Sequence, residues 1–236
     1  MSVPDHDPGD LPSPDGRAHP RRRRRPRGLG LRAWLTTRVV RRVLRSMALL
    51  KVVHIRVSGR EKVPRSGPVI LAGNHISMLD GIFLWGALRR RAIAIAMAEL
   101  WSWPVAGWLV KRLDFVPVDR SSSSSGSAAL ARLETALHFG GAVIMYPEGR
   151  CVPPGQRVRF KAGVTVLAFR TKTPVIPVKI IGSNEVLPLR RFRRDGRRFD
   201  RRRHVRLLFG TPLNPEDFGS PGEMLRELRW QIDALG

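Results

Sequence analysis

The sequence predicts a single α/β domain with a mixed, largely parallel central sheet flanked by helices. Beyond Lys51, short β-rich runs alternate with helical segments, which is typical of α/β domains and not of helical bundles or β-sandwiches. The length of 236 residues suits one domain with an extension and is enough to bury a substantial core. We expect a disordered arginine-rich tail at 1–30, a basic amphipathic helix on a membrane surface at 31–51, and the folded domain at 52–236.

The first 30 residues contain several prolines and acidic residues, followed by the arginine run 21–25 and Arg27, with almost nothing to bury. This composition predicts disorder. The N-terminus also lacks an apolar stretch after its charges, so we expect no export through a secretory signal.

Residues 31–51 combine an apolar stripe with an arginine-rich face, and this pattern predicts a basic amphipathic helix. The apolar positions are Leu31, Trp34, Leu35, Val39, Val43, Leu44, Met47 and Leu50, and the basic ones are Arg38, Arg41, Arg42 and Arg45. Such a helix either lies in the headgroup plane of an anionic membrane or packs on the domain with a solvated charged face. The helix alone does not separate these two interpretations.

The formal net charge of +24 predicts an anionic partner. Nucleic acid and anionic phospholipid both present dense phosphate, and charge does not distinguish them. A high-GC genome would also raise the arginine count. The second arginine run, Arg190 to Arg206, either adds to this attraction or forms a solvated loop. The single cysteine, Cys151, excludes intrachain disulfides and fits a reducing, cytoplasmic compartment.

The elements of the domain follow from local pattern. Strands are predicted at Val53–Val57, Pro68–Ala72, Ala92–Met97, Phe115–Val118, Ala142–Tyr146, Val175–Ile181 and His204–Phe209. Helices are predicted at Asp80–Leu88, Pro104–Lys111, Ser127–Phe139, Gly163–Arg170 and Gly222–Ala234. The serine run 121–125 predicts a flexible loop whose last serines cap the helix that follows.

The longest apolar stretch, Ala92 to Val110, contains Glu99 and Pro104, so a strand and a buried helix are expected there rather than a transmembrane helix. Its three tryptophans are Trp101, Trp103 and Trp108. They fit either an ordinary core or an apolar groove near a bilayer, and core is our expectation for most of the stretch.

A candidate catalytic pair follows the second predicted strand. This apolar run ends at Gly73-Asn74 and continues through His75 to Asp80 at the start of a helix. The five-residue spacing lets the carboxylate fold back onto one imidazole nitrogen, and a histidine held in this way can act as a general base. The alternative is a purely structural helix cap.

Three further motifs follow in order. They are Asp114-Phe-Val-Pro-Val-Asp-Arg120, Tyr146-Pro-Glu-Gly-Arg150, and Phe160-Lys-Ala-Gly163 followed by Thr173-Pro-Val-Ile-Pro177. With Asn74, His75 and Asp80 matching an N-H-x-x-x-x-D motif, the chain resembles the glycerolipid acyltransferases, which include 1-acyl-sn-glycerol-3-phosphate acyltransferase. The resemblance covers roughly residues 50 to 180, so the domain at 52–236 is expected to be an acyltransferase domain.

The resemblance implies O-acyl transfer from acyl-CoA or acyl carrier protein to the free hydroxyl of 1-acyl-sn-glycerol-3-phosphate, which gives phosphatidic acid in phospholipid biosynthesis. His75 would act as the base and Asp80 would orient it. Substrate binding would involve Asn74, Arg120, Glu148, Gly149 and Lys161. No cofactor or metal is implied. No covalent acyl-enzyme is expected either, with Ser77 and Cys151 the only nearby nucleophiles.

The resemblance also favours peripheral attachment to an anionic membrane, at the cytoplasmic face, because the acceptor is a membrane lipid. A lysophospholipid and a thioester donor are the expected partners, and nucleic acid is not.

The sequence departs from the family at Arg150-Cys151-Val152, where the family continues Thr-Arg-Ser. This leaves another lysolipid acceptor open. A more distant alternative is a non-catalytic protein that binds anionic membranes or nucleic acid.

Overall fold

The computed structural model describes residues 38–39, 42, 53–113, 115–119, 122–186 and 203–236. The tail predicted at 1–30 and most of the helix predicted at 31–51 lie outside the described residues. Arg38, Val39 and Arg42 are helical and exposed.

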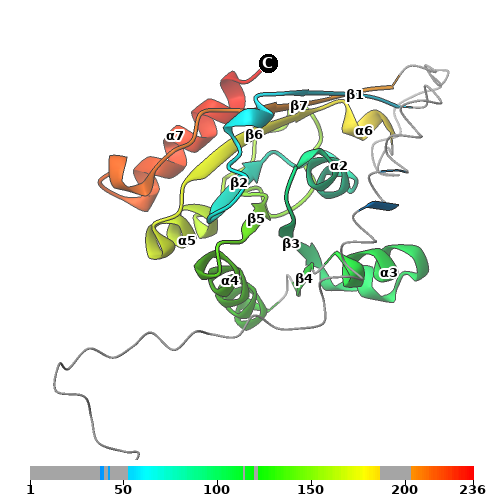
Figure 1. Cartoon of the computed structure of the whole chain (residues 1–236), viewed down its shortest axis with the longest axis horizontal. Coiled ribbons are helices and arrows are strands. Elements are labelled where there is room, and N and C mark those ends of the chain that lie inside the picture. Colours follow the sequence, from blue (N-terminus) through cyan, green and yellow to red (C-terminus); the bar gives the residue numbers. More distant parts are fainter. Residues whose placement is uncertain (1–37, 40–41, 43–52, 114, 120–121, 187–202) are drawn as a thin grey trace, which may run out of the picture.

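A seven-stranded sheet runs through the domain in the order β1-β7-β6-β2-β5-β3-β4 (Figure 1). The strands are β1 (Val53–Ser58), β2 (Val69–Gly73), β3 (Ala92–Met97), β4 (Val116–Val118), β5 (Ala142–Met145), β6 (Val175–Ile181) and β7 (Arg203–Phe209). Strands β2 to β6 pair in parallel, and β7 pairs antiparallel with β6 and parallel with β1. The mixed, largely parallel sheet is therefore confirmed.

All seven predicted strands are present, with their ends within one residue of those expected. The central strands were predictable because both faces of a parallel sheet are covered by helices, so a central strand is a continuous apolar run. Every residue of β2 and β5 is buried.

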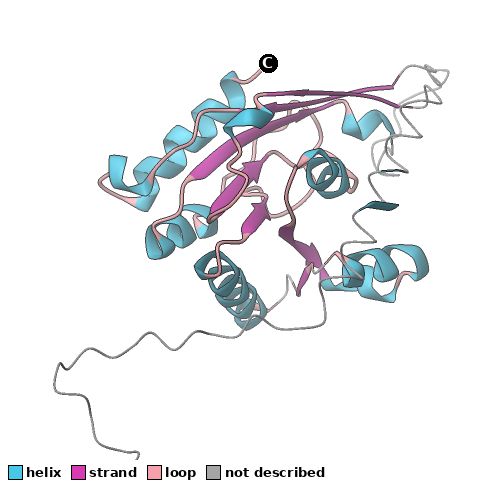
Figure 2. Cartoon of the chain, viewed as in Figure 1, coloured by secondary structure: helices cyan, strands magenta, loops and turns pink. Residues whose placement is uncertain are grey.

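Helices cover both faces of the sheet (Figure 2). They are α2 (Asp80–Ala87), α3 (Pro104–Arg112), α4 (Ser123–His138), α5 (Gly163–Thr171), α6 (Ser183–Val186) and α7 (Pro221–Ala234). Short 3₁₀ turns occur at η1 (Arg60–Lys62), η2 (Ala98–Ser102) and η4 (Pro215–Asp217). Helix α2 packs on one face, and α4, α5 and α7 pack on the other. The result is a three-layer α/β domain.

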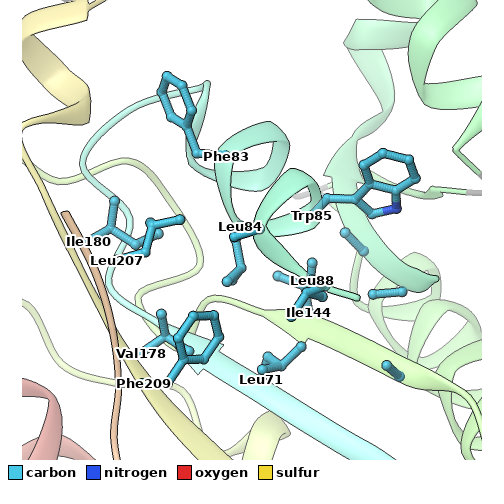
Figure 3. Close-up of a cluster of buried hydrophobic side chains, with 14 of the residues drawn as sticks. Leu71, Phe83, Leu84, Trp85, Leu88, Ile144, Val178, Ile180, Leu207 and Phe209 are labelled. Carbon is cyan, nitrogen blue, oxygen red and sulfur yellow. The ribbon is translucent and has the colours of Figure 1, made fainter. Parts of the chain in front are cut away.

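Strand alternation divides the core into two clusters. Leu71 of β2 points toward α2 and packs in the cluster that holds Leu84 and Leu88 (Figure 3). Its neighbours Ile70 and Ala72 point to the opposite face, where α4, α5 and α7 supply Leu133, Leu167 and Leu228 among other residues. Strand β2 is thus fixed from both sides, and so is the loop that follows it.

One boundary prediction was wrong. Helix α4 begins at Ser123, four residues before the predicted start, so the end of the serine run is helical and not a loop. Ser122 is the N-cap, and its hydroxyl accepts a hydrogen bond from the Ser125 backbone amide at 3.2 Å. Serine disfavours helix interiors because it competes for backbone hydrogen bonds, but this same property stabilises the first turn.

The apolar stretch from Ala92 folds into β3, η2 and α3, so the strand and the helix are present as expected. The helix is not buried as predicted, because Pro104, Trp108, Lys111 and Arg112 are exposed. Of the helices within the described ranges, none has the length and apolarity needed to cross a membrane. Trp103 and Trp108 are not core residues, because 46% and 50% of their surfaces are exposed. The side chain of Arg112 lies over the Trp108 ring, 5.3 Å from its centroid.

Candidate active site

The candidate site lies at the carboxyl edge of three neighbouring parallel strands. Strand β2 leads into the loop that carries His75, β5 leads into residues 146–152, and β6 leads into α6. The carboxyl ends of adjacent parallel strands meet at one edge of a sheet, where α/β proteins commonly place ligands. The strand order therefore brings residues from three distant parts of the chain together.

His75 and Asp80 form the pair that their spacing predicted. Nδ1 of His75 lies 2.9 Å from Oδ2 of Asp80, and Asp80 is fully buried. The same Oδ2 accepts the backbone amides of Ile76 at 2.7 Å and Ser77 at 2.8 Å. Asp80 thus accepts backbone amides and also holds the imidazole. The catalytic pair and the structural cap, which the sequence left as alternatives, are both features of this one arrangement.

Ser183 was missed by the sequence analysis. Its hydroxyl, at the start of α6, donates a hydrogen bond of 2.5 Å to Oδ1 of Asp80. A buried carboxylate is costly unless its oxygens accept hydrogen bonds, and here both oxygens do. No motif pointed to Ser183, because its place depends on β6 lying beside β2.

Residues 146–152 wrap around His75. The Tyr146 ring stacks on the imidazole, with centroids 4.2 Å apart and an angle of 13° between the planes. The backbone amide of His75 donates to Oε2 of Glu148 at 3.1 Å, and its carbonyl accepts the Val152 amide at 2.7 Å. The histidine is therefore restrained through its ring and through both backbone groups.

Two groups of this loop have shifted pKa values. Burial raises the pKa of Glu148 to about 7, with the charge of Asp80 adding to the effect. Burial also raises the pKa of the Tyr146 phenol well above its usual value, helped by the charges of Asp80 and Cys151. The buried Tyr146 hydroxyl has no hydrogen-bond partner among the residues that the structure describes. Burial is the largest cause of both shifts, because it disfavours the charged form of each group.

Cys151 contacts the imidazole of His75 at the nitrogen opposite Asp80. Its Sγ lies 3.2 Å from Nε2 of His75, the nitrogen that Asp80 leaves available. The sequence placed Cys151 just after a motif but gave no sign that the loop would turn it back onto the histidine.

Three of the predicted site residues line one cavity of about 480 Å³, namely His75, Gly149 and Lys161. Gly149 has a φ of 68°, and a Cβ added there would lie 2.9 Å from Cε of Lys161. The glycine thus permits both the turn and the close approach of the lysine. Ile95, Met97, Val118, Leu130 and Val164 contribute apolar walls, and Asp119 lies among the lining residues.

Asn74 and Glu148 line a second cavity, of about 680 Å³. Its lining includes the basic residues Arg157, Lys179, His204, Arg206 and Arg229. Both ends of the Asn74 amide are bonded to β6, since Nδ2 donates to the Ile180 carbonyl at 2.9 Å and Oδ1 accepts the Ile180 amide at 2.6 Å. Arg120, the predicted phosphate ligand, lies outside the described residues.

A histidine held by a buried carboxylate, beside a cavity lined by Lys161 and apolar side chains, suits acyl transfer to a hydroxyl. Within the described residues, no group of three or more His, Cys, Asp or Glu side chains could hold a metal ion. The family model described as Acyltransferase matches residues 54–181. The chain therefore belongs to the acyltransferase family.

Curated relatives give the comparison more detail. The chain is 28% identical to the chloroplastic 1-acyl-sn-glycerol-3-phosphate acyltransferase LPAT1 of Arabidopsis thaliana, over 61% of this chain and 40% of that protein. It is 26% identical to a probable 1-acyl-sn-glycerol-3-phosphate acyltransferase of Mycoplasma pneumoniae, over 76% and 69%. It is also 30% identical to the lyso-ornithine lipid O-acyltransferase of Pseudomonas aeruginosa, over 68% and 66%. The match to LPAT1 thus spans less than half of that relative.

The fold resembles the crystal structure of the 1-acyl-sn-glycerophosphate acyltransferase PlsC from Thermotoga maritima. The TM-score is 0.67 at 24% identity, and the match covers 86% of this chain and 78% of the other. The likeness supports the arrangement of the elements described above.

Proposed function

We propose that this protein transfers a fatty acyl chain from acyl-CoA or acyl carrier protein to the free hydroxyl of 1-acyl-sn-glycerol-3-phosphate. The observation that carries the proposal is the hydrogen bond of 2.9 Å between His75 and the buried Asp80, at the edge of a cavity. Asp80 holds the imidazole with Nδ1 protonated, which leaves Nε2 to accept a proton.

In this reaction His75 removes the proton of the acceptor hydroxyl as its oxygen attacks the acyl carbonyl. The thioester C–S bond breaks, and the leaving thiolate takes the proton back from the imidazolium. General base catalysis of this kind contributes about 10² to 10⁴ in rate. Neither a metal nor a redox cofactor is required by the balance of this step.

The two cavities suit the two substrates. The smaller one places Lys161 and apolar walls beside His75, so it fits a lysolipid with an anionic headgroup and one acyl chain. The larger one carries several basic side chains on the other side of residues 146–152. These charges favour the phosphates of coenzyme A or of the carrier protein's prosthetic group.

A second acceptor class has its own support. Asp119 lines the smaller cavity together with Lys161, and a carboxylate disfavours a phosphate but can bind an amine. The relative from Pseudomonas aeruginosa is described as acting on a lyso-ornithine lipid. An amine-bearing lysolipid is therefore our alternative to lysophosphatidate.

A transfer assay with radiolabelled donor tests the proposal. Purified full-length protein is given acyl-CoA or acyl carrier protein together with lysophosphatidate, lysophosphatidylethanolamine or lyso-ornithine lipid. We expect His75→Ala to lower the rate by at least about 10²-fold. His138→Ala, at an exposed position near the end of α4, is the matched control and should keep the wild-type rate. Absence of transfer by the wild type, or full activity of His75→Ala, would contradict the proposal.

We further propose that the protein is peripheral on the cytoplasmic face of an anionic membrane. Support comes from the basic amphipathic pattern at 31–51 and from exposed Trp103 and Trp108 beside Arg112. In vesicle sedimentation, Trp103→Ser with Trp108→Ser should weaken binding to phosphatidylglycerol vesicles. Trp230→Ser is the control, because Trp230 is 65% exposed but lies on α7, on the opposite face of the sheet. Equal binding to neutral and anionic vesicles would contradict this placement.

A further inference from the structure

We propose that outward-facing side chains of β1 and β7 form a docking surface for an acidic acyl carrier protein, whose prosthetic group then enters the larger cavity. This surface, the basic strip, consists of His54, Arg56, His204 and Arg206. The inference rests on the proposed function, because it takes the transfer reaction from it. It adds that a carrier-protein donor has a recognition surface of its own.

Strand alternation places the basic strip on one face of the sheet. Val205 of β7 is buried in the core cluster on the α2 side. Its two neighbours, His204 and Arg206, therefore point to the opposite face, and both are exposed. In the parallel register of β1 and β7, His54 lies beside His204 and Arg56 lies beside Arg206. The two histidine rings stack with their centroids 5.1 Å apart, so the four side chains form one continuous surface.

Like charges lie next to each other in the basic strip. Arg56 and Arg206 are register partners on neighbouring strands, where like charges repel. Strands β1, β6 and β7 contain no aspartate or glutamate. Within the described part of the chain, neither arginine forms an ion pair or a side-chain hydrogen bond. An anionic partner would relieve this repulsion, so the strip is suited to binding one.

Protection of the sheet edge does not account for the whole basic strip. Strand β1 is an edge strand, and a charged Arg56 there would discourage pairing with another chain. Strand β7 is paired on both sides, with β1 and with β6. His204 and Arg206 therefore have no free edge to protect, and binding of an anionic partner explains their positions.

The basic strip is continuous with the larger cavity. His204 and Arg206 belong to the cavity lining, whereas His54 and Arg56 lie outside it. Acidic residues also line this cavity, namely Glu148, Glu185 and Asp233. The uncompensated positive charge is thus on the strip. A donor small enough to fit within the cavity leaves the outer half of the strip uncovered, but a carrier protein covers all of it.

The cavity leads from the basic strip to the catalytic histidine. Strand β7 runs antiparallel to β6, so Arg206 pairs with Ile181 at the carboxyl end of β6 (Figure 1). The adjacent Ile180 bonds to the side chain of Asn74, which precedes His75 and also lines the larger cavity. A prosthetic group that enters from the strip is therefore directed toward His75.

The basic strip suits a protein partner better than a membrane surface. Binding at a bilayer interface uses apolar and aromatic side chains together with basic ones. The large hydrophobic residues that are exposed within the described ranges are Val39, Trp103, Trp108, Phe139 and Trp230. None of these five lies on β1 or β7. The strip thus offers charge without the apolar anchors of a lipid-binding face.

Charge reversal at Arg56 tests the docking surface. Arg56 lies in the basic strip but outside the linings of both cavities, so a small donor in the cavity does not contact it. We expect Arg56→Glu to raise the KM for palmitoyl-acyl carrier protein by about tenfold and the KM for palmitoyl-CoA by less than about twofold. Arg206→Glu should raise both values, because Arg206 lines the cavity. Lysophosphatidate is supplied in neutral detergent micelles, so that membrane binding does not contribute.

Arg132→Glu on α4 and Arg170→Glu on α5 are the matched controls. Both arginines are exposed, and each substitution makes the same change of charge as Arg56→Glu. Helix α4 packs on β3, β4 and β5, and α5 packs on β2, away from β1 and β7. Both controls should keep the wild-type KM for each donor. Raising NaCl from about 0.05 to 0.3 M should raise the carrier-protein KM of the wild type and of both controls more than that of Arg56→Glu.

Binding of unacylated carrier protein tests docking without turnover. Full-length protein is titrated calorimetrically with holo-acyl carrier protein. We expect Arg56→Glu to raise the Kd by about tenfold and Arg132→Glu to leave it unchanged. A circular dichroism melt of each variant excludes misfolding as the cause of a change.

The outcomes separate the docking surface from the proposed function. If the wild type acylates lysophosphatidate but binds no carrier protein, or if Arg56→Glu keeps the wild-type KM for the carrier-protein donor, the docking surface is wrong and the proposed function stands. If Arg56→Glu weakens sedimentation with phosphatidylglycerol vesicles and leaves the carrier-protein Kd unchanged, the strip contacts lipid and the docking surface is also wrong. If carrier protein binds through Arg56 but no lysolipid accepts the acyl chain, the docking surface stands and the proposed acceptor class is wrong.

Discussion

The hydroxyl of Ser183 donates a hydrogen bond of 2.5 Å to Oδ1 of Asp80, across 103 positions of sequence. This contact joins the start of α6 to the start of α2. Because Oδ2 of Asp80 already accepts two backbone amides and faces His75, the Ser183 contact completes the hydrogen bonding of a fully buried carboxylate. Ser183 is therefore a positioning residue, which acts on the imidazole through Asp80.

Replacing Ser183 with Ala should lower both stability and rate. A hydrogen bond to a charged group contributes about 1.5–3 kcal/mol, so we expect a loss of that size in the free energy of urea unfolding. Transfer should fall by about tenfold at saturating substrate, because Asp80 holds His75 less firmly. Ser102→Ala is the matched control, since that hydroxyl is exposed and should change stability by less than about 0.5 kcal/mol. Equal results for the two variants would remove Ser183 from the site.

Asn74→Ala is expected to be mainly a stability variant. Its side-chain amide bonds to the backbone amide and carbonyl of Ile180 on β6, and both hydrogen bonds are buried. Loss of the side chain leaves the Ile180 amide and carbonyl without those partners, at a cost of about 2–4 kcal/mol in unfolding free energy. Urea denaturation measures this loss. A stable variant with a raised KM would instead support the sequence prediction that Asn74 binds substrate.

The fold was largely predictable because its signals are local. Strands such as β2 and β5 are short apolar runs buried on both faces, so their burial is visible in the sequence as an unbroken run of apolar residues. The His75–Asp80 pair was also predictable, because both residues belong to one turn. The family motifs also pointed to Gly149 and Lys161 as substrate-binding residues, and both line the same cavity as His75.

Other features of the site depend on non-local geometry. Ser183 reaches Asp80 only because β6 lies beside β2. Cys151 meets His75 because the loop turns at Gly149, which has a φ of 68°. A glycine in the sequence permits such a turn but does not reveal its direction. The start of α4 at Ser123 was missed although the contact that decides it is local. A serine run is typical of a loop, but here Ser122 caps a helix that already includes the serines after it. For Ser183 and Cys151 the deciding contact joins residues far apart in the sequence, whereas the contact that starts α4 is local.

Gly149→Ala should raise the acceptor KM by more than its loss of unfolding free energy can explain. An L-residue with φ near 68° costs about 1–2 kcal/mol, and the added Cβ would also displace the Lys161 side chain. Gly155→Ala has a similar φ of 83° with no atom within 4 Å of the added Cβ, so it isolates the backbone cost. We expect both variants to lose similar unfolding free energy and only Gly149→Ala to raise the acceptor KM. Equal KM values would show that Lys161 does not bind the acceptor.

Glu148→Gln should change how stability depends on pH. The folded protein raises the pKa of Glu148 from 4.5 to about 7, so between these values the folded state binds more protons than the unfolded state. The unfolding free energy of the wild type therefore falls as pH rises through this window. Glutamine does not ionise, and its stability advantage over the wild type should grow from about pH 4.5 and level off above about pH 7. Parallel curves for the two proteins, measured by urea unfolding at several pH values, would contradict the raised pKa.

Tyr146→Phe should stabilise the protein. The tyrosine hydroxyl is buried without a hydrogen-bond partner among the described residues, and such a group costs about 1–3 kcal/mol relative to an apolar replacement. Phenylalanine keeps the ring that stacks on His75 at 4.2 Å, so the imidazole should keep its orientation. We expect the unfolding free energy to rise by about 1 kcal/mol in urea titrations. Tyr146→Leu is the contrasting variant, because it removes the stacked ring and should lower stability. A loss of stability in Tyr146→Phe would mean that the hydroxyl makes a hydrogen bond in solution.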